Sequence, residues 1–269
     1  MKFLYKLISI RLWIVASVVA FSLILTMTTL AQTVSPTEAM AAANQNYEAG
    51  NYVQAIEIYE TIIEAGIEDS ALYYNLGNAY FKEGDLGRAI LNYRRAARLD
   101  PRDADITANL RLARGQTLDK LDSTGDEASI NFVKIVENWF TLGEASVLAL
   151  LLWILLCALA IIAIVSRKFR QVSLWSMVVI SVFLLAGLIS IANRLYNAYN
   201  YPAAVIVAEN VEVMSGPGGA DNYVVEFELH SGAEVTQLES RDSWRRVSLP
   251  GNDFQGWISA SAIEPVIPN

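Results

Sequence analysis

Few side chains of this 269-residue chain are placed to do covalent chemistry. His230 is the only histidine and lies beside a Ser231-Gly232 turn, where we expect a partly exposed histidine. Cys157 is the only cysteine and lies in an uncharged apolar run, so a Cys-His nucleophile has no credible geometry. The sequence contains no phosphate-binding Gly-Lys-Ser/Thr loop and no metal-ligand spacing. We therefore predict no enzymatic activity, no catalytic residue, no metal site and no cofactor.

The composition limits the class of partner. The net charge is −8, which argues against a nucleic-acid surface because phosphate binding needs clustered Lys and Arg. Hydrophobic residues make up 54% of the chain, a share that is high for a soluble globule. Long uncharged apolar runs account for it, and the length is enough for two or three modules. The sequence therefore predicts a multidomain membrane protein.

A repeat with a period of 34 residues occupies the N-terminal half, where the segment 50–59 recurs as 84–93. This is the period of the tetratricopeptide repeat, which the second copy resembles closely. The matching positions are Tyr73, Leu76, Gly77, Tyr80, Gly84, Ala89, Tyr93, Ala96 and Pro101. Gly77 and Ala89 are small where the paired helices should cross closely. We predict an all-α helical solenoid over 36–116, made of two repeats and a capping helix over 104–114.

The resemblance implies a curved groove lined by the first helix of each repeat. Six side chains are predicted to face it as a peptide-binding site: Asn44, Tyr47, Tyr74, Asn78, Phe81 and Asn109. Asparagine can donate to and accept from a peptide backbone, and the aromatic rings can hold side chains. Met40 and Tyr74 stand where some family members have a lysine that binds a terminal carboxylate. The alternative is that these residues only pack the helices together.

Charge is divided within the repeats. The first repeat is acidic and holds no Lys or Arg, whereas arginines follow at 88, 94, 95, 98, 102, 111 and 114. Two interpretations are open: solvated outer faces, or a polarised surface that orients a partner.

Two apolar runs predict membrane-spanning helices over 145–166 and 171–193, because roughly 20 apolar residues cross a bilayer. The loop 167–170 between them holds three cations, which is typical of a cytoplasmic loop. Residues 1–31 have the layout of a secretory signal peptide, with an uncleaved anchor as the alternative. Residues 117–142 predict a linker and an interfacial amphipathic helix. We expect a bacterial cytoplasmic (inner) membrane protein, in contact with the lipid bilayer, with both folded modules outside the cytoplasm.

Residues 203–266 change to short alternating runs bounded by turns, which predicts a small all-β barrel. The pattern resembles a bacterial SH3-like domain, carried by the segments 211–217, 256–258 and 262–263. The residues predicted to contact a ligand are Gly216, Pro217, Trp244 and Trp257. The alternative for both tryptophans is a place in the barrel core.

The order of signal, tetratricopeptide repeats, membrane hairpin and SH3-like barrel resembles the BatE-type proteins of bacterial aerotolerance (Bat) operons. That resemblance implies a non-enzymatic scaffold in an envelope or stress-related complex. Its partners would be other membrane or periplasmic proteins, namely von Willebrand A-domain Bat proteins and, indirectly, a MoxR-type ATPase. The competing hypothesis is a cell-wall protein whose SH3-like module binds peptidoglycan peptides.

Overall fold

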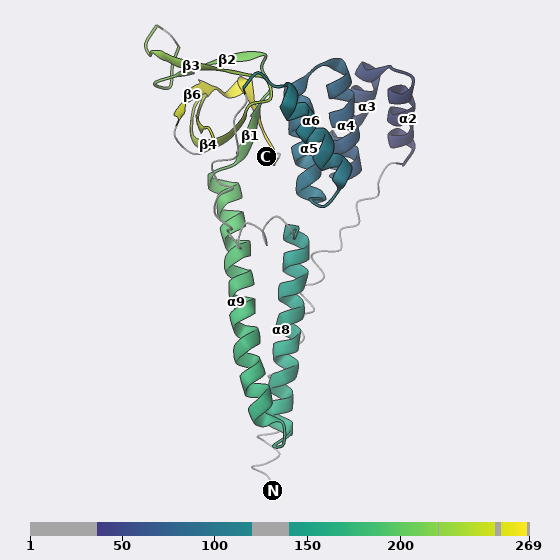
Figure 1. Cartoon of the computed structure of the whole chain (residues 1–269), viewed down its shortest axis with the longest axis vertical. Helices are drawn as coiled ribbons and strands as arrows, with labels where there is room; N and C mark the ends of the chain where they lie inside the picture. Colours follow the sequence, from purple (N-terminus) through teal and green to yellow (C-terminus); the bar gives the residue numbers. More distant parts are fainter. Residues whose placement is uncertain (1–36, 120–139, 220, 251–253, 268–269) are drawn as a thin grey trace. The chain divides into compact units, whose positions relative to one another are not determined.

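The structure is a computed structural model that describes residues 37–119, 140–219, 221–250 and 254–267. The predicted signal segment 1–31 lies outside the described residues, as does most of the predicted linker and interfacial helix over 117–142. The described part contains a helical region, a pair of long apolar helices and a C-terminal antiparallel sheet (Figure 1).

The helical region consists of five helices, α2 (Thr37–Glu48), α3 (Tyr52–Glu64), α4 (Ser70–Glu83), α5 (Leu86–Leu99) and α6 (Ala104–Gln116). Asp69, Asp85 and Asp103 precede α4, α5 and α6, and each carboxylate accepts hydrogen bonds from backbone N–H groups of the first turn. Gly84 ends α4 with a φ of 86°, a left-handed conformation that glycine adopts readily. These capping residues account for where α4, α5 and α6 begin and where α4 ends.

Tyrosine rings fill the helical core. Tyr59, Tyr73 and Tyr93 are each at most 1% exposed. A Cβ atom on Gly77 would lie 2.8 Å from the ring of Tyr93, so α4 and α5 approach each other closely at this point. Ala89 is fully buried, which agrees with the close crossing that the repeat pattern predicts.

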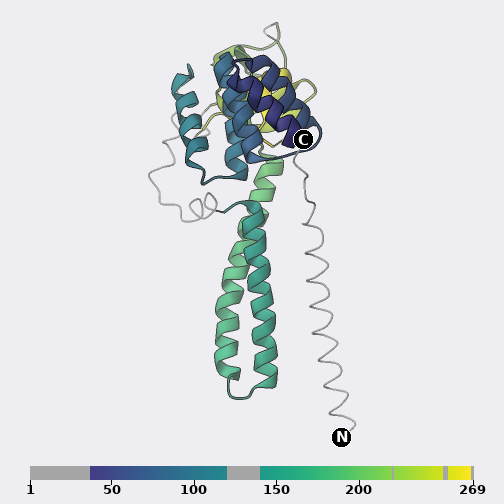
Figure 2. The same cartoon turned by 90° about the vertical axis from the view of Figure 1, so that its right-hand side faces the viewer.

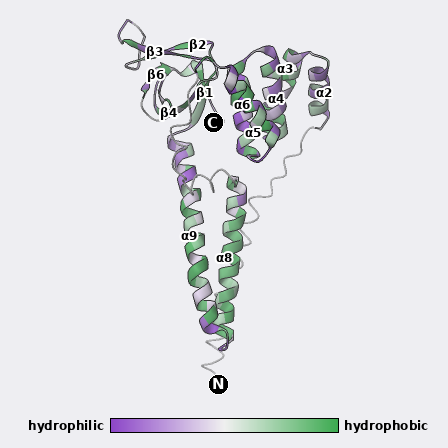
Figure 3. Ribbon diagram, viewed as in Figure 1, coloured by the Kyte–Doolittle hydropathy of each residue, from purple (hydrophilic) through white to green (hydrophobic). Residues whose placement is uncertain are grey.

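Two long apolar helices follow, α8 (Leu142–Val165) and α9 (Arg170–Asn200). They lie side by side in both views (Figures 1 and 2), and Figure 3 shows that most of their residues are hydrophobic. No residue of α8 is buried, and in α9 only Ser173 and Leu184 are. Both helices are long and apolar enough to cross a membrane, and their exposed apolar surface is unlike that of the core helices of a soluble protein.

The C-terminal module is one antiparallel sheet of seven strands in the order β3-β2-β6-β5-β4-β1-β7. The strands are β1 (Ala203–Ile206), β2 (Asn210–Met214), β3 (Val225–His230), β4 (Glu234–Arg241), β5 (Trp244–Ser248), β6 (Gln255–Ser259) and β7 (Ile263–Pro265). Its core packs Ile206, Val213, Leu229, Val247 and Ile258 on one face. The antiparallel strands agree with the predicted small barrel, but the barrel is not closed, because β3 and β7 remain edge strands that do not pair with each other.

Candidate binding surfaces

The predicted groove residues hold the first helices of successive units together. Asn78 on α4 accepts from the Tyr93 hydroxyl at 2.7 Å and from Nδ2 of Asn109 on α6 at 2.9 Å. Nδ2 of Asn109 also donates to the Tyr74 hydroxyl at 3.0 Å. The rings of Tyr74 and Tyr93 lie 6.0 Å apart. The structure therefore brings together three of the six predicted residues, Tyr74, Asn78 and Asn109.

The same arrangement occurs one repeat earlier. Asn44 on α2 accepts from the Tyr59 hydroxyl at 2.6 Å and from Nδ2 of Asn75 on α4 at 3.1 Å. Each of these residues precedes its counterpart in the second unit by 34 positions. We call these two sets, Asn44-Tyr59-Asn75 and Asn78-Tyr93-Asn109, the asparagine ladder. Burial raises the pKa of Tyr59 to about 12, so its hydroxyl keeps its proton and donates at neutral pH.

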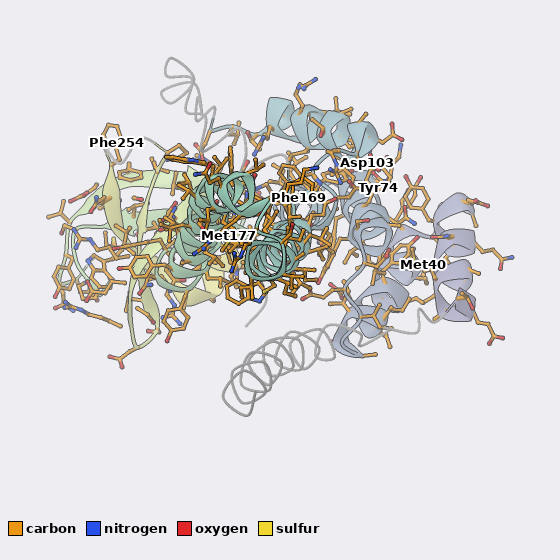
Figure 4. The ribbon with its side chains drawn as sticks, turned by 90° about the horizontal axis from the view of Figure 1, so that it is seen from below. Met40, Tyr74, Asp103, Phe169, Met177 and Phe254 are labelled. Carbon is orange, nitrogen blue, oxygen red and sulfur yellow. The ribbon has the colours of Figure 1, made fainter. Side chains whose placement is uncertain are left out.

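The remaining predicted groove residues supply apolar surface. Tyr47 on α2 packs its ring 5.4 Å from that of Tyr52 and is partly buried against the helical core. Phe81 on α4 is also partly buried there, together with Met40 and Tyr74. Figure 4 labels Met40 on α2 and Tyr74 on α4. The carboxamide oxygens of Asn44 and Asn78 thus serve helix packing, while the rings of Tyr47, Tyr74 and Phe81 are only partly buried.

The four residues of the sheet module that were predicted to contact a ligand lie in a pocket, in the packed part of the sheet and in a turn. Trp244 lines a pocket of about 400 Å³ together with Glu212, Glu228 and Met214. Trp257 is 7% exposed, with the Arg241 guanidinium 5.2 Å from its ring, so this tryptophan belongs to the packed part of the sheet. Gly216 packs against the Tyr223 ring, where any added side chain would clash. Pro217 is partly exposed and follows Gly216 in the same turn.

The arginines of α5 and α6 have a partner that sequence reasoning missed. Glu234 on β4 accepts from Nε and Nη2 of Arg114 at 2.5 and 2.9 Å, and lies 3.1 Å from Nε of Arg94. Glu264 on β7 lies 3.7 Å from Arg88 and 3.6 Å from Arg95. Four of the seven arginines in the run therefore form ion pairs with the sheet. These arginines therefore pair with acidic residues of the same chain. This differs from both interpretations of the sequence, which were solvated outer faces and a polarised surface that orients a partner.

Apolar and backbone contacts join the same two regions. Val205 and Val266, from the two ends of the sheet module, belong to the buried cluster of the helical core. The backbone N–H of Gly87 donates to the Ser231 hydroxyl at 3.0 Å. A Cβ atom on Gly87 would lie 2.6 Å from the Ile206 carbonyl oxygen, so α5 and β1 touch through their backbones. We call this contact between α5, α6 and the sheet the helix–sheet interface.

His230 belongs to the edge of that interface. Its backbone N–H donates to Oδ2 of Asp119 at 2.6 Å, and its Nδ1 lies 3.1 Å from Oδ1 of the same carboxylate. The only histidine therefore anchors the end of β3 to the residues that follow α6. This is a structural role, in keeping with the turn position expected from the sequence.

Comparison with known proteins supports the helical half. Residues 70–103, which hold α4 and α5, match the tetratricopeptide repeat family. No curated protein matches the chain. Stacked repeats of this family are typically non-enzymatic scaffolds that bind other proteins, so the matched region is a protein-interaction module.

Proposed function

We propose that the chain is a membrane-anchored adaptor whose repeats bind a segment of another protein. The asparagine ladder carries this proposal. It ties α2, α4 and α6 together by the same hydrogen bonds in both units, which holds the first helices of the repeats at a fixed spacing. A surface that is rigid before binding loses little conformational entropy when a partner docks. The rings of Tyr47, Tyr74 and Phe81 supply the apolar contacts.

The proposal that the chain is anchored in a membrane is based on α8 and α9. Their exposed apolar surface has no cover among the described residues, and a bilayer would cover it. The turn between the two helices is cationic: it contains Arg167 and Lys168, and Arg170 is the first residue of α9. The rule that cationic loops stay in the cytoplasm favours an orientation with the repeats and the sheet outside. Protease added to spheroplasts should then digest both modules; protection of either would contradict this orientation.

The partner is inferred from the order of the modules. Because that order resembles BatE-type proteins, we place the chain in a Bat-type envelope complex. Its repeats would bind a von Willebrand A-domain protein of the same membrane, and a MoxR-type ATPase would act through that protein. No residue of the surface favours a terminal carboxylate, since Met40 and Tyr74 occupy the lysine position. We therefore expect recognition of an internal apolar segment.

Affinity purification of the full chain from detergent, after crosslinking in cells, tests the proposal. Tyr47→Ala and Phe81→Ala remove ring surface from the proposed groove without breaking the asparagine ladder, and should deplete the captured partner at least tenfold. Val53→Ala is the matched control, because Val53 is 48% exposed on α3, outside the set of predicted groove residues. An identical set of captured proteins for all three variants would exclude the groove as the binding surface.

A second function is favoured by the pocket beside Trp244. A volume of about 400 Å³ and a partly exposed indole fit a small peptide unit better than a flat surface does. We propose that this pocket contacts peptidoglycan peptides. Co-sedimentation of the full chain in nanodiscs with purified cell wall should occur and should be lost in Trp244→Ala. Trp175→Ala, at an exposed position of α9, is the control; equal sedimentation of both variants would dismiss the pocket.

A further inference from the structure

A second pocket, of about 230 Å³, lies outside the six predicted groove residues. Its walls come from α3, α4 and α5, and β7 adds one residue. Ile63 and Leu76 provide apolar surface, while Arg88, Asn92, Arg95 and Glu264 provide polar groups. This volume is below the roughly 300 to 1,000 Å³ of typical small-molecule sites, so the pocket fits a single chemical group of a larger partner.

Two residues that line this pocket each carry a buried polar atom without a hydrogen-bond partner among the described residues. Asn92 is 2% exposed; its Nδ2 donates to the Arg88 carbonyl at 2.9 Å, whereas its Oδ1 accepts no hydrogen bond. Nε of Arg95 is also buried without an acceptor, although its Nη2 donates to the Pro265 carbonyl at 3.0 Å. Buried polar groups are paired in the great majority of cases, so an unpaired acceptor and an unpaired donor in one pocket need a reason.

The repeat itself does not require a polar residue at this point. Asn92 lies 34 residues after Ile58, so the same position of the first repeat holds an aliphatic side chain. Leucine or isoleucine would fill the site without leaving an oxygen unpaired. The asparagine is therefore specific to the second repeat, where α5 faces the sheet.

The charges around the pocket select against an ion. Glu60 and Glu64 from α3 and Glu264 from β7 would repel an anion, and Arg88 and Arg95 would repel a cation. A neutral group that both donates and accepts meets neither penalty. Asn92 and Arg95 are three residues apart on α5 and so lie on one face of the helix.

We propose that this pocket binds one amide group of a partner protein. The amide N–H donates to Oδ1 of Asn92, and the amide carbonyl accepts from Nε of Arg95. The ligand reaches these covered atoms by displacing the side chains of Arg88 and Glu264, which line the pocket and are 40% and 38% exposed. The amide comes either from an Asn or Gln side chain or from the main chain. Because α3 and α5 supply most of the walls, this site is separate from the proposed groove.

Methyl NMR on the full chain in nanodiscs tests the proposal, with the Ile63 methyl signal as the reporter. Propionamide represents a side-chain carboxamide, and N-methylacetamide represents a main-chain amide. Methyl acetate has the shape of N-methylacetamide but no N–H. We expect one of the amides to shift the Ile63 signal saturably, with an affinity at least tenfold higher than that of the ester. The tighter amide identifies the source of the group.

Asn92→Leu should weaken amide binding at least tenfold while leaving the fold intact, as the aliphatic residue of the first repeat does. Asn46→Leu is the matched control, because Nδ2 of Asn46 makes the same bond to the carbonyl four residues earlier, at 2.9 Å, on α2. Absence of a saturable shift with either amide would mean that the pocket holds only water and would overturn the proposal. Equal binding of ester and amide by the wild-type chain, or unchanged binding by Asn92→Leu, would overturn it too.

Discussion

Helices α3 and α5 occupy the same position in successive repeats, yet only their core-facing residues agree. Ala55 and Ala89 are both fully buried, and Tyr59 and Tyr93 are both 1% exposed. These pairs keep the residue type because each packs against the first helix of its own repeat. The repeat period therefore determines the side of each helix that faces inward.

The outer residues of the two helices differ in type and in burial. Val53 is 48% exposed, whereas its counterpart Gly87 is buried against β1. Glu57 is exposed, whereas its counterpart Leu91 is fully buried. Glu60 is likewise replaced by Arg94, which pairs with Glu234. Helix α5 therefore packs against the sheet with the face that α3 exposes to solvent.

Exchanging residues between the two helices gives the largest expected effect. Leu91→Glu places the residue of the first repeat at a fully buried position and should lower the free energy of unfolding by about 3 to 5 kcal/mol, because the charge has no partner there. The reverse exchange, Glu57→Leu, should be within about 0.5 kcal/mol of neutral at its exposed position. Chemical denaturation of the full chain in detergent measures both. Similar values for the two variants would contradict the distinction.

The substitution Gly87→Val should have the second-largest effect on stability. The added side chain would clash with the Ile206 carbonyl oxygen and the Val207 Cα. Because these are backbone atoms that cannot move to another rotamer, we expect the free energy of unfolding to fall by about 1 to 3 kcal/mol. The sheet should also become easier to cleave from the helices in limited proteolysis. Gly115→Val serves as the control, since nothing lies within 4 Å of the Cβ position on this exposed residue of α6. A Gly87 variant as stable as the Gly115 variant would show that α5 and β1 do not touch.

Glu234→Gln tests the ionic part of the helix–sheet interface. Its carboxylate is 23% exposed and its arginine partners are 38% and 43% exposed, so the loss should be only about 1 kcal/mol and should shrink at high salt. Glu239→Gln is matched, because Glu239 is also on β4 and also pairs with an arginine, Arg241, within the sheet. Thermal unfolding at low and high salt distinguishes them. A larger effect of Glu239→Gln would place the main ionic stabilisation elsewhere.

The smallest expected effect on stability comes from the tyrosine hydrogen bonds that α3 and α5 both make in the asparagine ladder. Tyr59→Phe and Tyr93→Phe each remove one donor from the asparagine ladder, and each should cost about 1 kcal/mol. Because the geometry repeats, the two losses in unfolding free energy should agree within about 0.5 kcal/mol. Denaturant titration measures the difference. Losses that differ by more than this would mean that the two rungs of the ladder are not equivalent.

Much of this architecture could be predicted from local patterns. The 34-residue period and Gly84 placed the repeat helices, because helix pairs and their turns depend on neighbouring residues. Two uncharged runs predicted the long helices α8 and α9, because the length and apolar character of a run are also local properties of the sequence. Alternating residues predicted short strands, but whether the sheet closes depends on pairing between distant strands, and here β3 and β7 stay apart.

Residue patterns along the chain were enough to predict which faces of the repeat helices point inward and which segments are apolar enough to cross a bilayer. The partners of the arginine run, the close approach at Gly87 and the unpaired oxygen of Asn92 became visible in the folded chain. The ion pairs with Glu234 and Glu264 and the contact at Gly87 join the repeats to residues more than a hundred positions later in the chain. Periodicity reports how a residue relates to its near neighbours, so contacts across such a separation become visible only when the chain is folded.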